Sequence, residues 1–489
     1  MSAFRGQAVN GYSTANPHRY RRASFRCLDA GPSPVAPRCC GGHPMRRARP
    51  RRVMLVTQST AMGGMEMHVQ YLAAELIARH ATVSVVVPRD RAFDELARRC
   101  SGLNATVMRL DTDSRNGRRA QLFNWLRYAG WGRAQRPDVV HIHTGGATGG
   151  LTVAATSKWL FRATVVRTEH DVPEEAPGIQ LKVSSRLTDA CCDAVVAVSR
   201  RNAALRRVRL RTPKNFVAVL NGVPVPSCPT DPDRRSAVRR MLGILPDEVL
   251  VGSVVRLAEG KGLNDLLHSF ALISSASPHR LLLVGDGPLR ADLQSLAESL
   301  GIARRVIFAG QQTDPDPFFR AMDIFVLAVP EGSMSIALLE AMARQVPSVI
   351  TFGGPEEAVI DGVTGRTATP RDPEALAAVL SELVDDPVER SRLGLAGLAH
   401  VQATLSARRV ACDLLSVYGT ARSGEIPIQL QVNALPRGSG TVLGCRRPDQ
   451  DNMAASGELL TDCVSLGDCV AKAVGDRAED GAVNVQVHS

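Results

Sequence analysis

Short runs of β-branched residues alternate with amphipathic stretches from Val53 onward, and this alternation constrains the fold more than any other feature of the sequence. Such alternation is typical of βα units in a parallel sheet. Between the first two runs, apolar residues recur at intervals of three and four, which marks one face of a helix. We therefore predict a doubly wound α/β fold. The strands of this first series are expected at 53–57, 82–87, 106–110, 138–142, 164–168 and 194–198.

A second series with the same pattern follows a segment rich in proline and turn residues at 224–234. We predict two Rossmann-like domains, 53–223 and 249–405, separated by a linker region over 224–248. Two such domains facing one another would place a central cleft at the carboxyl ends of both sheets. The strands of the second series are expected at 249–255, 280–284, 305–308, 323–327 and 347–351.

The net charge of +11 is concentrated near the amino terminus. Residues 1–52 hold eleven Arg, no Lys and one acid, whereas residues 421–489 lack periodicity. We predict a disordered, basic, low-complexity leader over 1–52 and a poorly ordered tail over 421–489. A basic arm could bind nucleic acid or anionic lipid, but an unstructured leader, or a start codon placed too early, is favoured. Because the body lacks a basic stripe interleaved with aromatic residues, no nucleic-acid partner is expected.

Cysteine and histidine usage bears on the compartment and on metals. The chain has eleven Cys and no CxxC pair, which fits reduced thiols in a cytosol. Its longest apolar stretches are far shorter than the roughly 18 residues of a membrane-spanning helix, so any membrane role should be peripheral. His141 and His143 share one face of a strand end. Two ligands are too few for a metal site, and no metal is expected.

Two glycine turns follow predicted strands. Gly63 and Gly64 lie between the first strand and its helix, where absent Cβ atoms let backbone amides approach an anion; a tight βα turn is the alternative. Gly285, in VGDGP, also follows a strand, but Arg290 stands at the third glycine of GxGxxG, so this is weak evidence for a dinucleotide. The absence of GxxxxGK[ST] from the sequence argues against a P-loop kinase or ATPase.

Two cations follow the first strand of the second series. Lys261 precedes a helix and opposes its dipole, a cost of roughly 0.3 to 1 kcal/mol that a bound anion would reverse. Together with Arg256, it can be interpreted as a clamp on a diphosphate or as a solvated surface pair.

Polar side chains also follow other predicted strands. His170 comes directly after a buried-looking strand, where polar side chains of open α/β sheets commonly face the ligand crevice; a buried histidine bonded to backbone is the alternative. The segment from Glu331 to Ser333 is a turn that can leave its amides free. Glu340, on the helix that follows, could accept two vicinal hydroxyls, as ribose recognition requires, or pair with Arg344.

In their order and spacing these stretches resemble the retaining glycosyltransferases of the GT-B fold, the group-1 or family-four class. The resemblance covers about residues 53–420 and rests on GGMExxHV, NGV (221–223), VxRLxxxKG, LLLVGDGP, EG…LLEAMA and GGPEEAVIDGVTG. It implies that Gly63 and Gly64 line the phosphate side of the cleft and that His170 touches the donor sugar. Arg256 and Lys261 would hold the donor diphosphate, and Glu340 would bind the ribose. The helix over 406–420 would cross back to the first domain.

The glutamate segment departs from the family pattern. Eight residues lie between Glu331 and Glu340, whereas the family usually has seven. The stretch from 325–327 to 338–340 has the usual length, so the Glu-Gly pair is displaced by one residue. Either Glu331 reaches the sugar from a re-registered loop, or Gly332 occupies its place; we favour the loop, and we include Gly285 and Ser333 among the expected donor-binding residues.

The function that the resemblance implies is transfer of a sugar, with retention, from a nucleotide diphosphate donor to a glycan or lipid-linked acceptor in cell-surface polysaccharide or glycolipid synthesis. No metal or other cofactor is expected, because Arg256 and Lys261 supply the positive charge. The expected location is the cytoplasm, with possible peripheral contact to an anionic membrane at the inner face of the plasma membrane. The alternatives are a nucleotide-sugar epimerase on the same fold and a binding-only protein.

Overall fold

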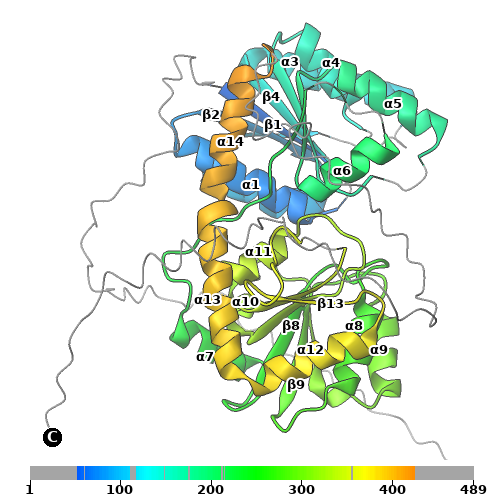
Figure 1. Cartoon of the computed structure of the whole chain (residues 1–489). Coiled ribbons are helices and arrows are strands. Elements are labelled where there is room, and N and C mark those ends of the chain that lie inside the picture. Colours follow the sequence, from blue (N-terminus) through cyan, green and yellow to red (C-terminus); the bar gives the residue numbers. More distant parts are fainter. Residues whose placement is uncertain are drawn as a thin grey trace, which may run out of the picture. The chain divides into compact units, whose positions relative to one another are not determined.

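A computed structural model describes residues 52–59, 61–110, 117–147, 149–173, 177–210, 213, 215–353 and 356–423. They form two lobes, each built on a parallel sheet, and the predicted fold class is confirmed (Figure 1). Nearly all of the predicted leader and tail lies outside the described residues.

The N-lobe holds a seven-stranded sheet in the order β3-β2-β1-β4-β5-β6-β7, with every neighbouring pair parallel. Its central strands are buried on both faces, as helix-covered parallel strands must be. The strands are β1 (Arg52–Gln58), β2 (Thr82–Pro88), β3 (Thr106–Leu110), β4 (Val139–Thr144), β5 (Thr164–Glu169), β6 (Ala194–Ala197) and β7 (Phe216–Ala218). The helices are α1 (Gly64–Ile77), α2 (Asp94–Gly102), α3 (Gly117–Gln135), α4 (Leu151–Trp159), α5 (Ile179–Ala190) and α6 (Arg200–Arg209).

The C-lobe repeats the plan with six parallel strands in the order β10-β9-β8-β11-β12-β13. The strands are β8 (Val249–Val254), β9 (His279–Val284), β10 (Val306–Gly310), β11 (Ile324–Leu327), β12 (Ser348–Thr351) and β13 (Arg366–Ala368). The helices are α7 (Pro232–Met241), α8 (Leu263–Leu272), α9 (Arg290–Ser299), α10 (Asp316–Ala321), α11 (Ile336–Met342), α12 (Pro373–Asp385) and α13 (Pro387–Thr404). In both sheets the strand order reverses at the first strand, where doubly wound folds bind ligands.

The Pro-rich stretch expected to be a linker continues into α7. Asp231 caps this helix and Pro232 opens it, which is a common helix start. Its inner face is charged: Arg235 and Arg239 both pair with Asp323, which precedes β11. Part of the predicted linker region is therefore a packed element of the C-lobe.

The last helix, α14 (Ala407–Thr420), packs against α1 of the N-lobe (Figure 1). Val410, Leu414 and Val417 belong to the same apolar cluster as the first strands of the chain. Tyr418 reaches further in, because its hydroxyl lies 2.7 Å from Nδ1 of His141 on β4. The end of the described chain thus completes the core of the N-lobe.

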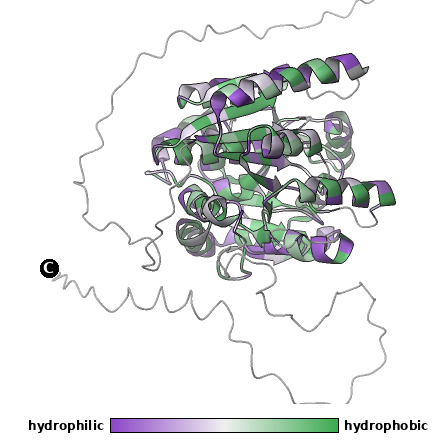
Figure 2. Cartoon of the chain, turned by 90° about the horizontal axis from the view of Figure 1, so that it is seen from above, coloured by the Kyte–Doolittle hydropathy of each residue, from purple (hydrophilic) through white to green (hydrophobic). Residues whose placement is uncertain are grey.

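The strands are mostly hydrophobic, while the helices carry both hydrophilic and hydrophobic residues (Figure 2). Among the described residues, no helix is both long enough and apolar enough to cross a membrane.

Candidate active site

Three loops at the carboxyl edge of the C-lobe sheet pack tightly together. Gly262 has φ +65°, and a Cβ there would lie 1.8 Å from the carbonyl oxygen of Ala328, just after β11. Gly285 has φ +137°, and its Cβ would lie 2.0 Å from the carbonyl oxygen of Val255, just after β8. Only glycine tolerates these approaches. The glycines therefore bring the loops after β8, β9 and β11 to one edge.

Arg256 and Lys261 lie on the loop after β8, and both are exposed. Neither side chain forms an ion pair or hydrogen bond with any residue in the described ranges. Lys261 also precedes the left-handed Gly262 that caps the N-terminus of α8. Two unneutralised cations beside a helix N-terminus form an environment that attracts an anion.

Gly63 and Gly64 begin α1 on the N-lobe side. The Gly63 amide donates to Oε2 of Glu66 over 2.8 Å. A Cβ on Gly64 would lie 3.4 Å from Cγ1 of Ile336, the first residue of α11. The glycine pair therefore lies next to the start of a C-lobe helix, and we call this region of contact between the lobes the lobe junction.

The segment before α11 forms much of the lobe junction. Ser333 Oγ accepts a hydrogen bond from Nδ2 of Asn202 over 2.9 Å, and the Met334 carbonyl accepts one from Nδ2 of Asn221 over 2.9 Å. These contacts hold the loop against α6 and the end of the N-lobe sheet.

The structure places Glu331 against α6. Its Oε1 lies 3.2 Å from a guanidinium nitrogen of Arg209 and 3.9 Å from one of Arg201. Gly332 follows, where a Cβ would come within 3.0 Å of Val329. Glu331 is thus bound by two arginines of the opposite lobe, and its assignment to the first glutamate position stays a prediction.

Glu340, on α11, is buried at the lobe junction. The hydroxyl of Tyr71, on α1, donates a hydrogen bond to its Oε1. Burial raises the pKa of Glu340, while the Tyr71 hydrogen bond and the Arg344 charge oppose the shift. The carboxylate expected to bind a ribose is therefore occupied by a side chain of the other lobe.

His170 belongs to a cluster of buried histidines at the ends of β4 and β5. Its Nε2 lies 3.1 Å from Nδ1 of His143, and its backbone amide donates to the carbonyls of Thr144 and Gly145. The ring of His68, on α1, lies 5.0 Å from that of His170 and 5.4 Å from that of His143.

The histidine cluster is held neutral by burial. Desolvation lowers the pKa of His68 to about 4 and places the pKa values of His141, His143 and His170 well below their ordinary value. Asn221 opposes the lowering of the pKa of His68. Neither Oδ1 of Asn221 nor Nε2 of His68 has a hydrogen-bond partner in the described part of the chain. Neutral His170 can donate or accept a hydrogen bond, but it is a poor source of positive charge at pH 7.

The same cluster has the geometry of a possible metal site. One nitrogen each of His68, His143 and His170 lies within 4.8 Å of the others. Of the two histidines considered from the sequence, His141 and His143 on β4, only His143 belongs to this group, because the other two histidines come from α1 and from the residue after β5. The expectation that no metal takes part stays a prediction.

Buried charges fix the elements behind the site. Arg167 of β5 and Arg206 of α6 lie in the core with Glu169 and Asp189, and each arginine pairs with both acids. Such a network leaves a costly unpaired charge if one member is lost. It joins β5, which precedes His170, to α6, which carries Arg209 and Arg201.

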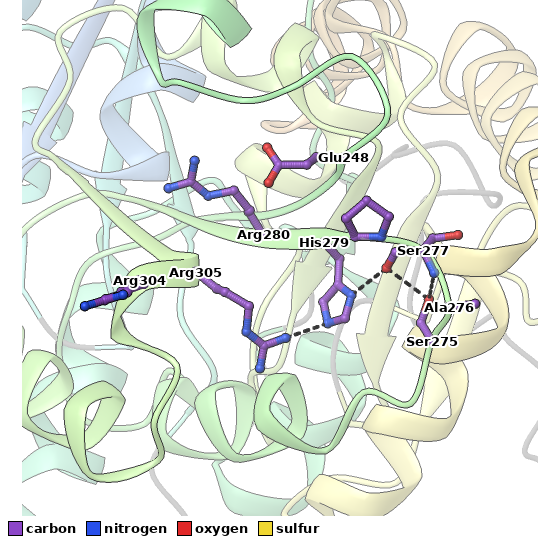
Figure 3. A pocket seen from close by; sticks show the side chains of 9 residues that line it. Glu248, Ser275, Ala276, Ser277, His279, Arg280, Arg304 and Arg305 are labelled. Atoms are coloured by element: carbon purple, nitrogen blue, oxygen red, sulfur yellow. Dashed lines mark hydrogen bonds between the residues drawn. The ribbon is translucent and has the colours of Figure 1, made fainter.

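A separate pocket lies at the opposite edge of the C-lobe sheet, at the amino-terminal ends of β8, β9 and β10. Arg305 donates to Nε2 of His279 over 2.9 Å within it (Figure 3). Its lining residues are Glu248, Ser275, Ala276, Ser277, Pro278, His279, Arg280, Arg304 and Arg305. This pocket contains none of the expected site residues.

Two family profiles match the chain. Residues 62–225 match the family described as Glycosyltransferase Family 4, and residues 248–386 match Glycosyl transferases group 1. Together the two matches span more than half of the chain, and the chain belongs to this glycosyltransferase family. The resemblance inferred from the motifs is thereby confirmed.

Curated relatives match over part of their length. The lipopolysaccharide core biosynthesis glycosyltransferase LpsE of Rhizobium meliloti is 34% identical over 32% of this chain and 46% of its own. A GDP-mannose-dependent phosphatidylinositol monomannoside mannosyltransferase of Corynebacterium glutamicum is 30% identical over 36% of this chain and 49% of its own. The chain thus spans about half the length of these relatives.

Solved structures share the fold. HepE from Anabaena in complex with UDP-glucose has a TM-score of 0.62 at 21% identity, over 75% of this chain and 99% of its own. WaaG, a glycosyltransferase involved in lipopolysaccharide biosynthesis, has a TM-score of 0.55 at 16% identity, over 75% of this chain and 99% of its own.

The sequence did not single out the residues that face the predicted ones across the lobe junction. Tyr71 and Asn202 lie on amphipathic helices, and the sequence pattern there does not distinguish them from other polar or aromatic residues of a helix. His68 belongs to the GGMEMHV motif and lies one turn before Leu72 on the inner face of α1, but only the fold shows that its ring lies against that of His170. Asn221 belongs to the NGV motif, but only the fold shows that its side chain donates a hydrogen bond to the carbonyl of Met334.

Proposed function

We propose that this protein transfers a sugar from a nucleotide diphosphate donor to a hydroxyl of a glycan or lipid-linked acceptor, with retention at the anomeric carbon. The observation that carries the proposal is the pair of exposed cations, Arg256 and Lys261, on a loop that Gly262 and Gly285 hold against the neighbouring loops. Relatives named for lipopolysaccharide core and phosphatidylinositol mannoside synthesis support an acceptor in cell-surface glycan or glycolipid synthesis.

The difficult step is departure of the diphosphate. Negative charge grows on the leaving group as the glycosidic bond breaks, and fixed cations and helix N-termini aimed at it stabilise the transition state more than the ground state. Arg256, Lys261 and the amides at Gly63 and Gly64 are proposed to act there, with Gly285 lining the site. No metal is required in this scheme.

The remaining site residues position the sugar and the nucleotide. His170, neutral and fixed by its backbone hydrogen bonds, is proposed to contact the donor sugar, and Glu331 to reach the sugar once its contacts with α6 are released. Ser333 contributes its turn amides and Glu340 the ribose contact. The acceptor hydroxyl attacks from the same face, with the leaving phosphate as base. Peripheral contact with an anionic membrane at the cytoplasmic face is part of the proposal.

Replacing Lys261 with Ala tests the clamp. Turnover is expected to fall by orders of magnitude with an unchanged circular-dichroism spectrum, because Lys261 has no partner to lose within the described residues. Arg240→Ala, at an exposed arginine of α7 in the same lobe, should leave turnover unchanged. Full turnover and donor affinity in Lys261→Ala would rule the clamp out. Nucleotide release is the readout, with the donor first chosen by thermal-shift screening of nucleotide sugars.

The two alternatives give different products. An epimerase would isomerise the sugar when incubated with donor alone, without any acceptor. A binding-only protein would show donor binding by calorimetry and no nucleotide release with any acceptor, as expected if the displaced Glu331 disables transfer.

A further inference from the structure

Helix α5 has an inverted amphipathic pattern. Its apolar residues Ile179, Val183 and Leu187 are spaced four apart and form one stripe, and their exposed fractions are 72%, 45% and 52%. The residues that it buries are the small polar Ser185 and Thr188. A helix on a globular core is expected to do the opposite. The apolar stripe of α5 therefore needs a partner outside the lobe.

Two neighbouring helices extend this apolar surface. Phe123 and Leu126 of α3 are exposed, and so is Trp159 at the end of α4. Trp125 of α3 donates to Thr156 of α4 over 2.8 Å, and α4 contacts α5, so the three helices lie side by side (Figure 1). We call this surface of α3, α4 and α5 the outer helical face. Large exposed apolar patches mark interaction sites.

The outer helical face is also strongly basic. Residues 117–135, 151–162 and 179–190 contain eight Lys or Arg and a single acid, Asp189. That acid points inward, to Arg167 and Arg206. Of the basic residues, Lys158 pairs with Asp193, just after α5. By contrast, α12 contains Glu374, Glu382 and Asp385 and no basic residue. On α3, α4 and α5 an excess of positive charge thus accompanies the exposed apolar side chains; α6 and α7 are also rich in arginine.

We propose that the outer helical face docks on an anionic membrane surface. Aromatic and aliphatic side chains flanked by Lys and Arg are the composition of helices that lie in a lipid interface. A second copy of the chain fits less well, because a two-fold contact would place this basic surface against itself.

The inference rests on the proposed function, because a lipid-linked acceptor would reach the site from the membrane on which the outer helical face docks. Helix α4 follows the loop after β4, which ends beside His143, and α5 follows the loop after His170. The helices that would touch the membrane therefore begin at the edge of the sheet where the site lies.

The test is sedimentation of the full chain with phosphatidylcholine vesicles, with and without phosphatidylglycerol. Wild type should bind the anionic vesicles, with binding weakened by salt. A triple variant, Ile179→Glu, Val183→Glu and Leu187→Glu, should lose at least tenfold in affinity. Val183→Glu alone should also weaken binding, and its matched control is Val388→Glu, the same change at a 77% exposed position on α13, which should bind as wild type does. Melting curves establish that each variant folds.

Several results would overturn the proposal. Wild type could fail to bind anionic vesicles. Alternatively, the triple variant could bind them as tightly as wild type, which would assign membrane binding to another part of the chain, such as the basic leader. Sedimentation velocity showing a wild-type dimer and a monomeric triple variant would make the face a self-association surface. Thermal stabilisation by nucleoside diphosphates separates the two hypotheses: if it persists while vesicle binding fails, only the docking proposal is lost.

Discussion

Glu66 is a carboxylic acid buried at the first turn of α1. Its Oε2 accepts the Gly63 amide, while its Oε1 has no hydrogen-bond partner among the described residues. Burial raises its pKa from 4.5 to about 7. The folded protein therefore binds this proton more tightly than the unfolded chain does. Its contribution to stability is full below pH 4.5 and is lost as the pH rises through 7.

Glu66→Gln should remove this pH dependence. Between pH 5 and pH 8, the free energy of unfolding of wild type should fall by about 2 to 3 kcal/mol relative to the variant, since one pKa unit corresponds to about 1.4 kcal/mol. Urea denaturation at both pH values measures the difference. Glu298→Gln, at an exposed position on α9, is the isosteric control and should leave the pH dependence unchanged. A parallel pH response of Glu66→Gln and wild type would contradict the buried-acid interpretation.

At the scale of single residues, sequence reasoning could select residues that follow strands but not the residues that contact them from the other lobe. Gly285 and His170 directly follow β9 and β5, and the chain order alone predicts that such residues lie near a ligand edge. Tyr71 and Glu340, by contrast, lie 269 residues apart and meet only because two lobes pack together. No local pattern contains that information.

Among the elements, the long strands were predictable because strands of a covered parallel sheet form continuous apolar runs. Strands β7 and β13 escaped prediction because each has only three residues, too few to show a period. Helix α7 was not predicted for a different reason. Its inner face carries Arg235 and Arg239 in place of apolar residues, so the hydrophobic periodicity that marks a packed helix is absent.

Helices α1 and α11 are joined by the hydrogen bond from Tyr71 to Glu340. If both oxygens of Glu340 accept hydrogen bonds from the donor ribose, the Tyr71 hydroxyl is displaced from Oε1. Tyr71→Phe should therefore lower the stability of the free protein by about 1 to 3 kcal/mol, the cost of an unsatisfied buried group. It should also increase the thermal stabilisation produced by nucleoside diphosphates, because the competing hydroxyl is gone.

The control for this prediction is Tyr128→Phe. Tyr128 is also buried, and its hydroxyl bonds to Ser157 between α3 and α4, away from the lobe junction. Its loss should lower stability without changing the response to nucleotide. Equal nucleotide responses in the two variants would mean that Glu340 does not exchange Tyr71 for a ligand.

At the scale of the whole molecule, the two lobes share parts of their cores. Val198 and Val223 of the N-terminal half pack in the same apolar cluster as the C-lobe strands, and α14 returns to the N-lobe. A chain ending at residue 405 would expose the apolar surface that Val410, Leu414 and Val417 now cover. It should be poorly soluble, whereas a chain ending at 423 should purify as a folded protein.

Soluble yield and a cooperative melting curve compare the two truncations. The chain ending at 423 is the control, because it lacks the residues after α14 but keeps α14 itself. Equal solubility and melting of both chains would show that α14 is dispensable for the N-lobe.

The return of α14 has a consequence for biosynthesis. The first lobe to leave the ribosome lacks a piece of its own core until Val410 has been made, some 190 residues after the last N-lobe strand. At roughly 5 to 20 residues per second, that delay is on the order of ten to forty seconds. During this interval the nascent N-lobe exposes the apolar surface of α1 that α14 later covers. A chaperone that binds exposed apolar surface is therefore expected to bind this chain most strongly before translation ends.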